Sequence, residues 1–110
     1  MMGSMAHALL NRLTARPGQR RRVVEILIES GRRFDDNPAC LLYLVTEAVD
    51  DPDVIWVTDL WISQQEHLAA LADPALRPYI DQAMPLLTGM PEQIPVRMVG
   101  GKTPGGQSTG

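Results

Sequence analysis

The segment covering residues 53–71 constrains the fold of this chain more than any other, because it joins a strand to a helix with almost no linker. Residues 54–61 are rich in β-branched and aromatic side chains, which favours a largely buried β-strand. Ser63 then stands three residues before Glu66 and just ahead of an apolar run, which is the capping-box pattern of a helix N-terminus. The sequence therefore predicts a helix that begins at Ser63 and carries His67 about one turn along its length.

The junction between this strand and this helix is where we expect the active site. Trp61 closes the strand, and only Ile62 separates it from the helix cap. A large flat indole ring and the titratable imidazole of His67 would therefore be neighbours at the mouth between sheet and helix.

The remaining hydrophobic pattern predicts a single α+β domain. Apolar stretches, helical periodicity and turn signals predict strands at 6–15, 40–49 and 94–99, a helix at 19–34 and a second helical stretch at 73–87 that Pro78 delays or kinks. With the strand at 54–61, the order is β-α-β-β-α-β. This order is the ferredoxin-like split βαβ arrangement, with one four-stranded antiparallel sheet.

Both faces of that sheet are expected to be apolar. Simple alternation places Val54, Trp56, Leu60, Cys40, Leu42 and Leu44 on one side, and Ile55, Val57, Trp61, Leu41, Tyr43 and Val45 on the other. The few helices can cover only one face, and an exposed apolar sheet is a liability in a monomer. We therefore expect a two-fold homodimer in which a second copy covers the other face.

Composition excludes several classes of protein. A chain of 110 residues is long enough for one core, and a formal charge of −3 gives no electrostatic case for nucleic acid. The basic cluster Arg20–Arg22 is expected to be a solvated helix face. Cys40 is the only cysteine, which excludes an internal disulfide and a multi-thiolate metal site. No apolar run is long enough to span a membrane, so a cytoplasmic protein is expected.

The two ends of the chain differ from the rest in composition. Residues 1–5 read as a tag-like or disordered start, residues 6–101 as the single domain, and residues 102–110, rich in Gly, Ser, Thr and Pro, as a disordered tail.

Several short motifs accompany this order of elements, namely Ala15-Arg16-Pro17-Gly18, Asn37-Pro38, Asp59-Leu60-Trp61-Ile62-Ser63, Glu66-His67 and Val99-Gly100-Gly101. Together they resemble the antibiotic biosynthesis monooxygenase family over about residues 9–101. The resemblance implies a dimeric α+β barrel of ferredoxin-like subunits. It also implies an oxygenase that converts anthrones or hydroquinones to quinones without metal, flavin or haem.

Two residues fit the resemblance more closely than the fold requires. Asn11 falls where cofactor-free anthrone oxygenases and haem-degrading relatives carry a strand-one asparagine, and Trp61 falls on the junction tryptophan of the oxygenases. An amide within an apolar strand costs a few kcal/mol unless it is hydrogen-bonded, so Asn11 needs a partner. That partner is either a substrate or a neighbouring protein group, and Trp61 is either a slot for an aromatic ring or a core residue.

The sequence also departs from the family at informative positions. One anthrone-oxidising branch has asparagine where this chain has Val57, and tyrosine where it has His67, so a mechanism using those two groups does not transfer. The haem-degrading branch needs a late helical histidine, and residues 73–87 contain none. Haem is therefore a poor candidate, and we expect no cofactor and no metal.

The leading hypothesis is a monooxygenase that acts on a small aromatic substrate with O₂. Trp61 would form the slot, Asn11 would hydrogen-bond the substrate oxygen as negative charge develops, and His67 would be the base. Further pocket candidates are Tyr43, Val57, Arg77 and Tyr79. The alternative is a non-catalytic barrel that binds a small ligand. Convergence of Asn11 and Trp61 on one cavity would favour catalysis, and divergence would favour binding or structure.

Overall fold

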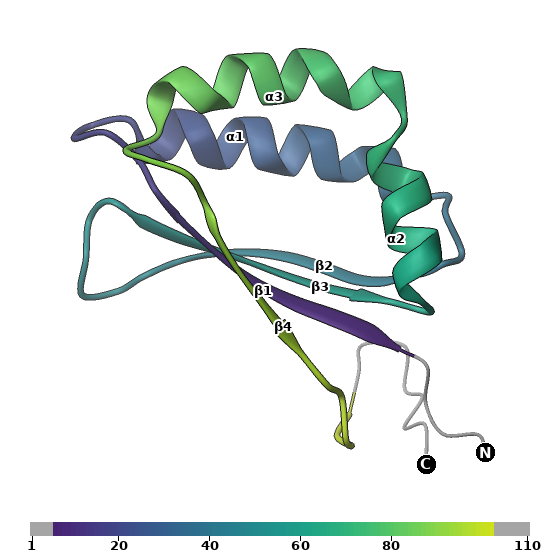
Figure 1. Cartoon of the computed structure of the whole chain (residues 1–110). Coiled ribbons are helices and arrows are strands. Elements are labelled where there is room, and N and C mark those ends of the chain that lie inside the picture. The colour runs from purple at the N-terminus through teal and green to yellow at the C-terminus, as the bar shows by residue number, and fades with distance from the viewer. Residues whose placement is uncertain (1–5, 103–110) are drawn as a thin grey trace.

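The computed structural model describes residues 6–102, and the two ends expected to be disordered lie outside this range except for Lys102. The elements, in chain order, are β1 (His7–Thr14), α1 (Arg20–Gly31), η1 (Arg32–Phe34), β2 (Cys40–Glu47), β3 (Val54–Trp61), α2 (Gln64–Leu71), η2 (Pro74–Leu76), α3 (Arg77–Ala83), η3 (Met84–Leu86) and β4 (Glu92–Val96), with η denoting a short 3₁₀ helix (Figure 1).

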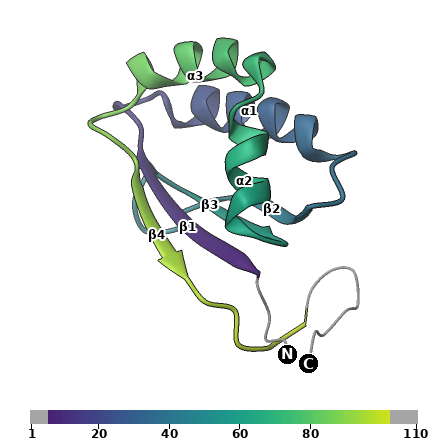
Figure 2. The same ribbon diagram turned by 45° about the vertical axis from the view of Figure 1, so that its right-hand side comes forward.

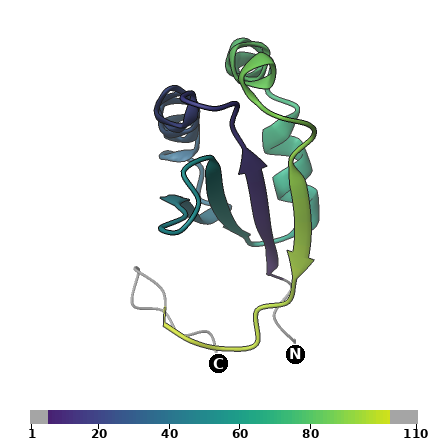
Figure 3. The same ribbon diagram turned by 90° about the vertical axis from the view of Figure 1, so that its left-hand side faces the viewer.

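The four strands form one antiparallel sheet in the order β2-β3-β1-β4, which confirms the ferredoxin-like fold. Helices α1 and α3 lie side by side over one face, and α2 stands at the end of the sheet where β3 finishes (Figures 1 and 2). In a view turned by 90°, α1 and α3 are seen nearly end-on above the strands, and no helix of residues 6–102 lies on the opposite side of the sheet (Figure 3).

The strand register decides which side chains face the helices. Asn11 of β1 pairs with Val57 of β3, which in turn pairs with Val45 of β2, so these residues share the helix-covered face. The core lies on this face and consists of Leu13, Ala15, Val23, Ile55, Val57 and Leu87.

A β-bulge between Cys40 and Leu42 changes the face of one residue. Cys40 pairs with Trp61, which places it on the helix-covered side rather than with Leu42 and Leu44 as simple alternation predicts. Beyond the bulge, Tyr43 and Val45 follow the expected alternation.

The predicted junction between β3 and α2 is confirmed. Ser63 has extended backbone angles, and its Oγ accepts a hydrogen bond of 3.2 Å from the backbone N–H of Glu66. The return bond expected from the Glu66 side chain is not among the hydrogen bonds of the described residues, so the cap is a serine cap rather than a full capping box.

The second helical stretch and the last strand differ from the prediction. Residues 74–86 divide into η2, α3 and η3, and Pro78 lies in the first turn of α3, where a missing N–H is tolerated. Strand β4 covers Glu92–Val96 instead of 94–99, because pairing with β1 sets its limits. Pro95 is accommodated because β4 is an edge strand.

The face opposite the helices carries three rows of cross-strand neighbours. The middle row consists of Leu44, Thr58, Leu10 and Ile94. Leu44 and Ile94 are 48% and 43% exposed in the single chain. This face is therefore largely apolar, and no helix of the described part of the chain lies over it.

Arg20 stabilises the hairpin between β2 and β3 from the first turn of α1. Its Nη1 donates to the backbone oxygens of Ala48, Asp51 and Val54 at 3.0, 2.7 and 3.3 Å. Arg20 is thus a structural residue, whereas Arg21 and Arg22 have the exposed side chains expected of a solvated helix face.

Candidate active site

A cavity of about 290 Å³ lies between the helix-covered face of the sheet and the three α-helices. The sheet supplies its floor through Asn11, Leu13, Tyr43, Val57, Asp59, Trp61 and Gln93, and the helical segments supply its walls and roof, including Leu27, Phe34, His67, Leu76, Tyr79 and Met84. Its lining is mainly apolar with a few polar groups, which is the usual composition of a site for a small organic ligand.

Asp59 is the only acidic residue that lines this cavity among the described residues. It is 8% exposed because strand alternation directs it to the same face as Val57 and Trp61. Burial raises the pKa of Asp59 to about 6. The nearby indole N–H of Trp61 opposes this rise, although neither Asp59 Oδ1 nor Trp61 Nε1 completes a hydrogen bond with any described residue.

His67 lies over Asp59 from α2 and is 4% exposed. Its Nε2 is 3.8 Å from Asp59 Oδ2. Burial lowers the pKa of His67, and the charge that His7 can carry lowers it further. His67 is therefore neutral near pH 7, and the contact joins a carboxylate to a neutral imidazole rather than forming an ion pair.

His7 continues this arrangement toward the surface. It lies at the start of β1, is only partly buried, and its ring centroid is 5.3 Å from that of His67. Asp59, His67 and His7 thus form a series of titratable groups that leads from the cavity floor toward the edge of the molecule.

Asn11 already has hydrogen-bond partners within the chain. Its Nδ2 donates to the backbone oxygen of Val57 at 3.0 Å, and its Oδ1 accepts from Gln93 Nε2 at 3.1 Å. An amide nitrogen carries two hydrogens, so one N–H of Asn11 forms no hydrogen bond with the described residues and is free to meet a ligand in the cavity. The partners explain how an amide is tolerated in this strand.

Aromatic rings form one wall of the cavity. Phe34 stands edge-on to both Trp61 and Tyr43, with ring centroids 5.2 and 5.4 Å apart, and Trp61 is fully buried. The His67 ring lies 5.1 Å from that of Trp61. These contacts fix the indole ring at the junction, as edge-to-face pairs do in protein cores.

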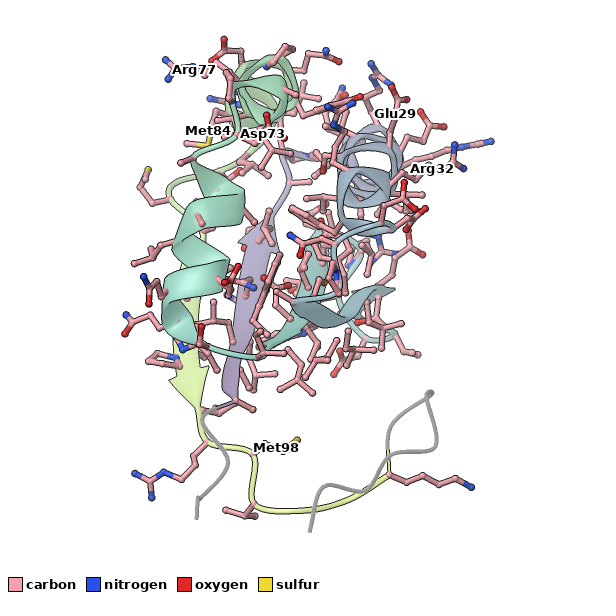
Figure 4. All side chains as sticks on the ribbon, turned by 90° about the vertical axis from the view of Figure 1, so that its right-hand side faces the viewer. Glu29, Arg32, Asp73, Arg77, Met84 and Met98 are labelled. Carbon is pink, nitrogen blue, oxygen red and sulfur yellow. The ribbon has the colours of Figure 1, made fainter. Side chains whose placement is uncertain are left out.

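The structure brings most of the candidate residues together. Asn11, Tyr43, Val57, Trp61, His67 and Tyr79 all line the one cavity. Arg77 does not line it: the side chain is 77% exposed, forms an ion pair with Asp81 at 3.1 Å, and points away from the sheet on the outer side of α3 (Figure 4).

Among the lining residues that were not sequence candidates, three carry polar or aromatic groups discussed above, namely Asp59, Phe34 and Gln93. Asp59 could have been found, since it alternates with Val57 and Trp61 along one strand face. Phe34 reaches the cavity only because η1 follows α1, and Gln93 only because β4 pairs with β1. No local sequence signal indicates either contact.

Two broader properties complete the description of residues 6–102. They contain no helix that could cross a membrane and no group of three or more His, Cys, Asp or Glu side chains arranged to hold a metal ion.

Comparisons with known proteins agree with the fold. The family model for antibiotic biosynthesis monooxygenases matches residues 6–82. A crystal structure from Chloroflexus aurantiacus, named for the same family, is 34% identical, with a TM-score of 0.77 over 87% of this chain and 95% of that one.

More distant solved structures show the same fold. SnoaB, a cofactor-independent oxygenase from Streptomyces nogalater, is 17% identical, with a TM-score of 0.72 over 86% of this chain and 95% of that one. A protein from Nitrosomonas europaea, also named for the family, is 7% identical, with a TM-score of 0.82 over 90% and 95% of the two chains. Among curated proteins, no sequence matches this chain significantly.

Proposed function

Since this chain belongs to the antibiotic biosynthesis monooxygenase family, we propose that it oxidises a small aromatic phenol, anthrone or hydroquinone to a quinone with O₂ and without a cofactor. The observation that carries the proposal is the convergence of Asn11, Trp61 and His67 on one mainly apolar cavity. The description of SnoaB as a cofactor-independent oxygenase supports the same chemistry.

The chemistry needs little from the protein beyond binding and proton transfer. A deprotonated anthrone or hydroquinone is a strong reductant, so the electrons that reduce O₂ come from the substrate itself. The protein must hold a flat ring, accept a proton and exclude water from the resulting anion. The cavity offers an aromatic wall for the ring and buried proton-accepting groups at one end.

Asn11 and His67 have distinct roles in this proposal. The free N–H of Asn11 stabilises negative charge on a substrate oxygen, as a preorganised donor does in an oxyanion hole. His67, neutral near pH 7, belongs to the end of the cavity that receives the proton. Trp61 provides the flat surface beside which the substrate ring lies.

We also propose that the functional unit is a homodimer. The uncovered sheet face carries Leu44 and Ile94 with nearly half of each side chain exposed, on a surface that spans all four strands. A second copy that packs its own apolar sheet face against this one would bury both, in an isologous two-fold interface.

Oxygenation of defined substrates tests the function. Purified protein, treated with a chelator and dialysed, is incubated with a panel of anthrones and hydroquinones under ¹⁸O₂, and quinones are measured by mass spectrometry. We expect an anthrone to be converted with one labelled oxygen, faster than in buffer alone. Ligand binding without turnover across the panel would instead favour the non-catalytic barrel.

A further inference from the structure

Asp59 is a buried carboxylate with only weak partners, the nearby indole N–H of Trp61 among them. No described residue completes a hydrogen bond to its Oδ1, and the nearest basic group, His67, is a neutral imidazole at 3.8 Å. A carboxylate that stabilises a fold is normally paired or bonded to several donors, because burying its charge alone is costly. A stabilising role therefore does not explain why a carboxylate is buried at position 59. Asp59 lies on the floor of the cavity, where a ligand can reach it.

Its position relative to Asn11 matches a specific ligand chemistry. Asn11 pairs with Val57, and Asp59 follows two residues later on the same face of β3, so the two polar side chains are diagonal neighbours, about 7–8 Å apart at the backbone. Asn11 offers a donor and Asp59 an acceptor. An aromatic ring system that carries one oxygen atom as acceptor and one acidic O–H or enolisable position would satisfy both.

We infer that Asp59 is the group that takes the substrate's proton in this cavity and passes it to His67. This inference rests on the proposed function and deepens it. In an anthrone, the C–H bond breaks, its electron pair remains on the ring system as the anion, and the proton forms an O–H bond on Asp59. The anion then gives electrons to O₂ and forms a carbon–oxygen bond.

Groups within the site account for each proton that is transferred in this oxidation. Asp59 returns to a carboxylate when His67 Nε2 accepts the proton, and this proton then reaches the peroxide oxygen that leaves as water. The second hydrogen of the oxidised carbon leaves as a proton when the O–O bond breaks and the carbonyl forms, and it combines with the departing hydroxide to complete that water. One O₂ and one CH₂ group thus give one C=O group and one water, with no external reductant. His7, beside His67, links the site to the surface for exchange with solvent.

The groups that face Asp59 limit which residues can make the activity depend on pH near 6. Cys40 and Tyr43 face it from β2, and burial raises the pKa of both, that of Tyr43 to about 12, so neither ionises near pH 6. His67 faces it from α2, and the α1 residues that line the cavity are uncharged. The ring of His7, from β1, is 5.3 Å from that of His67. Loss of activity on acidification would therefore come from Asp59 or from the His67–His7 pair, and the Asp59→Asn variant separates these two sources.

The test measures oxidation of 1,8-dihydroxyanthrone by the full chain between pH 4.5 and 8, after subtraction of the rate without protein. For the wild type we expect the rate to fall as pH decreases through about 6. Asp59→Asn keeps the shape of the side chain and should lower kcat on the order of 100-fold. The rate of this variant should also no longer fall as pH decreases through about 6. Glu66→Gln, which removes an exposed carboxylate next to His67 in sequence, is the matched control and should match the wild type.

Chemical rescue separates proton transfer from a structural role. Asp59→Ala leaves space for a small acid, so added formate should restore part of the rate, while formamide of similar shape should not. This rescue experiment also tests the role of Asp59 if the Asp59→Asn variant folds poorly. An active wild type with an unaffected Asp59→Asn variant, or equal rescue by formate and formamide, would overturn the role of Asp59 and leave the oxygenase proposal intact. A wild type inactive on the whole panel would overturn both.

Discussion

The ring of Tyr43 lies directly against the Cα of Gly31, at the point where α1 ends over β2. A Cβ on residue 31 would overlap the Cδ2 and Cε2 atoms of that ring. The ring cannot easily move away, because the Tyr43 hydroxyl donates to the backbone oxygen of Leu27 at 3.2 Å and Phe34 packs edge-on against it. Glycine is needed here for close approach, since its backbone angles are ordinary helical ones.

Gly31→Ala should therefore destabilise the protein, although alanine is normally the better helix former. We expect a loss of about 1–3 kcal/mol in the free energy of unfolding, which is the usual cost of overpacking. Urea denaturation measures it, with Glu29→Ala on the same helix as a control that should change little. In a Tyr43→Leu background the penalty should largely vanish, and a penalty of equal size there would exclude the ring as its cause.

The free energy of unfolding should depend on pH because the charge of Asp59 is buried unfavourably. The pKa of Asp59 in the folded state, about 6, lies above its ordinary value of 3.8, so the folded state holds the proton more tightly than the unfolded state. The contribution of Asp59 to the free energy of unfolding therefore falls as pH rises from about 4 to 6, by roughly 2–3 kcal/mol. His67 has the opposite effect, because its lowered pKa makes the folded state lose stability as pH falls below about 6.5.

Comparing Asp59→Asn with the wild type at each pH isolates the Asp59 contribution, because the direct contribution of His67 is common to both. The variant should be the more stable protein at pH 7.5, and the difference should shrink toward zero near pH 4. Denaturation midpoints across this range provide the measurement. A variant that is less stable at pH 7.5 would show that the carboxylate has a structural partner in solution.

Asn11 can be tested apart from folding. Asn11→Leu keeps a similar volume and removes the amide that faces the cavity, so the fold should persist while kcat falls on the order of 100-fold. The bond from Gln93 to Asn11 gives a control: Gln93→Ala removes the partner that Asn11 Oδ1 has among the described residues but leaves the Asn11 donor, and should cost far less. Steady-state kinetics with 1,8-dihydroxyanthrone distinguish these outcomes. Equal rates for Asn11→Leu and the wild type would leave Asn11 with a structural role only.

The homodimer can be tested on the uncovered sheet face. Leu44→Glu places a charge in the middle row of that face and should give monomers at micromolar concentration in light scattering, with the circular dichroism spectrum retained. Leu68 is a matched control, since it is 57% exposed on α2, and Leu68→Glu should leave the dimer unchanged. A monomeric wild type would exclude this assembly.

Local chemistry explains which features were predictable from sequence. The β3–α2 junction was placed correctly because β-branched residues, the Ser63 cap and the apolar run all lie within a few residues of one another. The limits of β4 were wrong because they depend on pairing with β1, which is distant in the chain. The bulge that places Cys40 on the helix-covered face is likewise a property of the paired strands, and no local turn signal in the sequence indicates it.

The candidate site follows the same division. Asn11, Trp61 and His67 were identified by residue type and resemblance, and the structure places them around one cavity. Arg77 was a pocket candidate as an amphipathic side chain, but its direction depends on how α3 rotates over the sheet. Its exposed side chain forms an ion pair with Asp81 on the same helix, outside the cavity.

The roof of the cavity can change in sequence without changing the sheet beneath it. Residues 74–86 form three short helical pieces, and Pro74, Pro78 and Pro85 each lie in the first turn of one of them. Helices this short do not persist without tertiary contacts, so their positions are set mainly by the sheet beneath and the side chains between. Substitutions in this segment can therefore reshape the accepted ligand while Asp59 on β3, His67 on α2 and the register of the strands stay unchanged. Selectivity and reactivity can evolve separately in this protein.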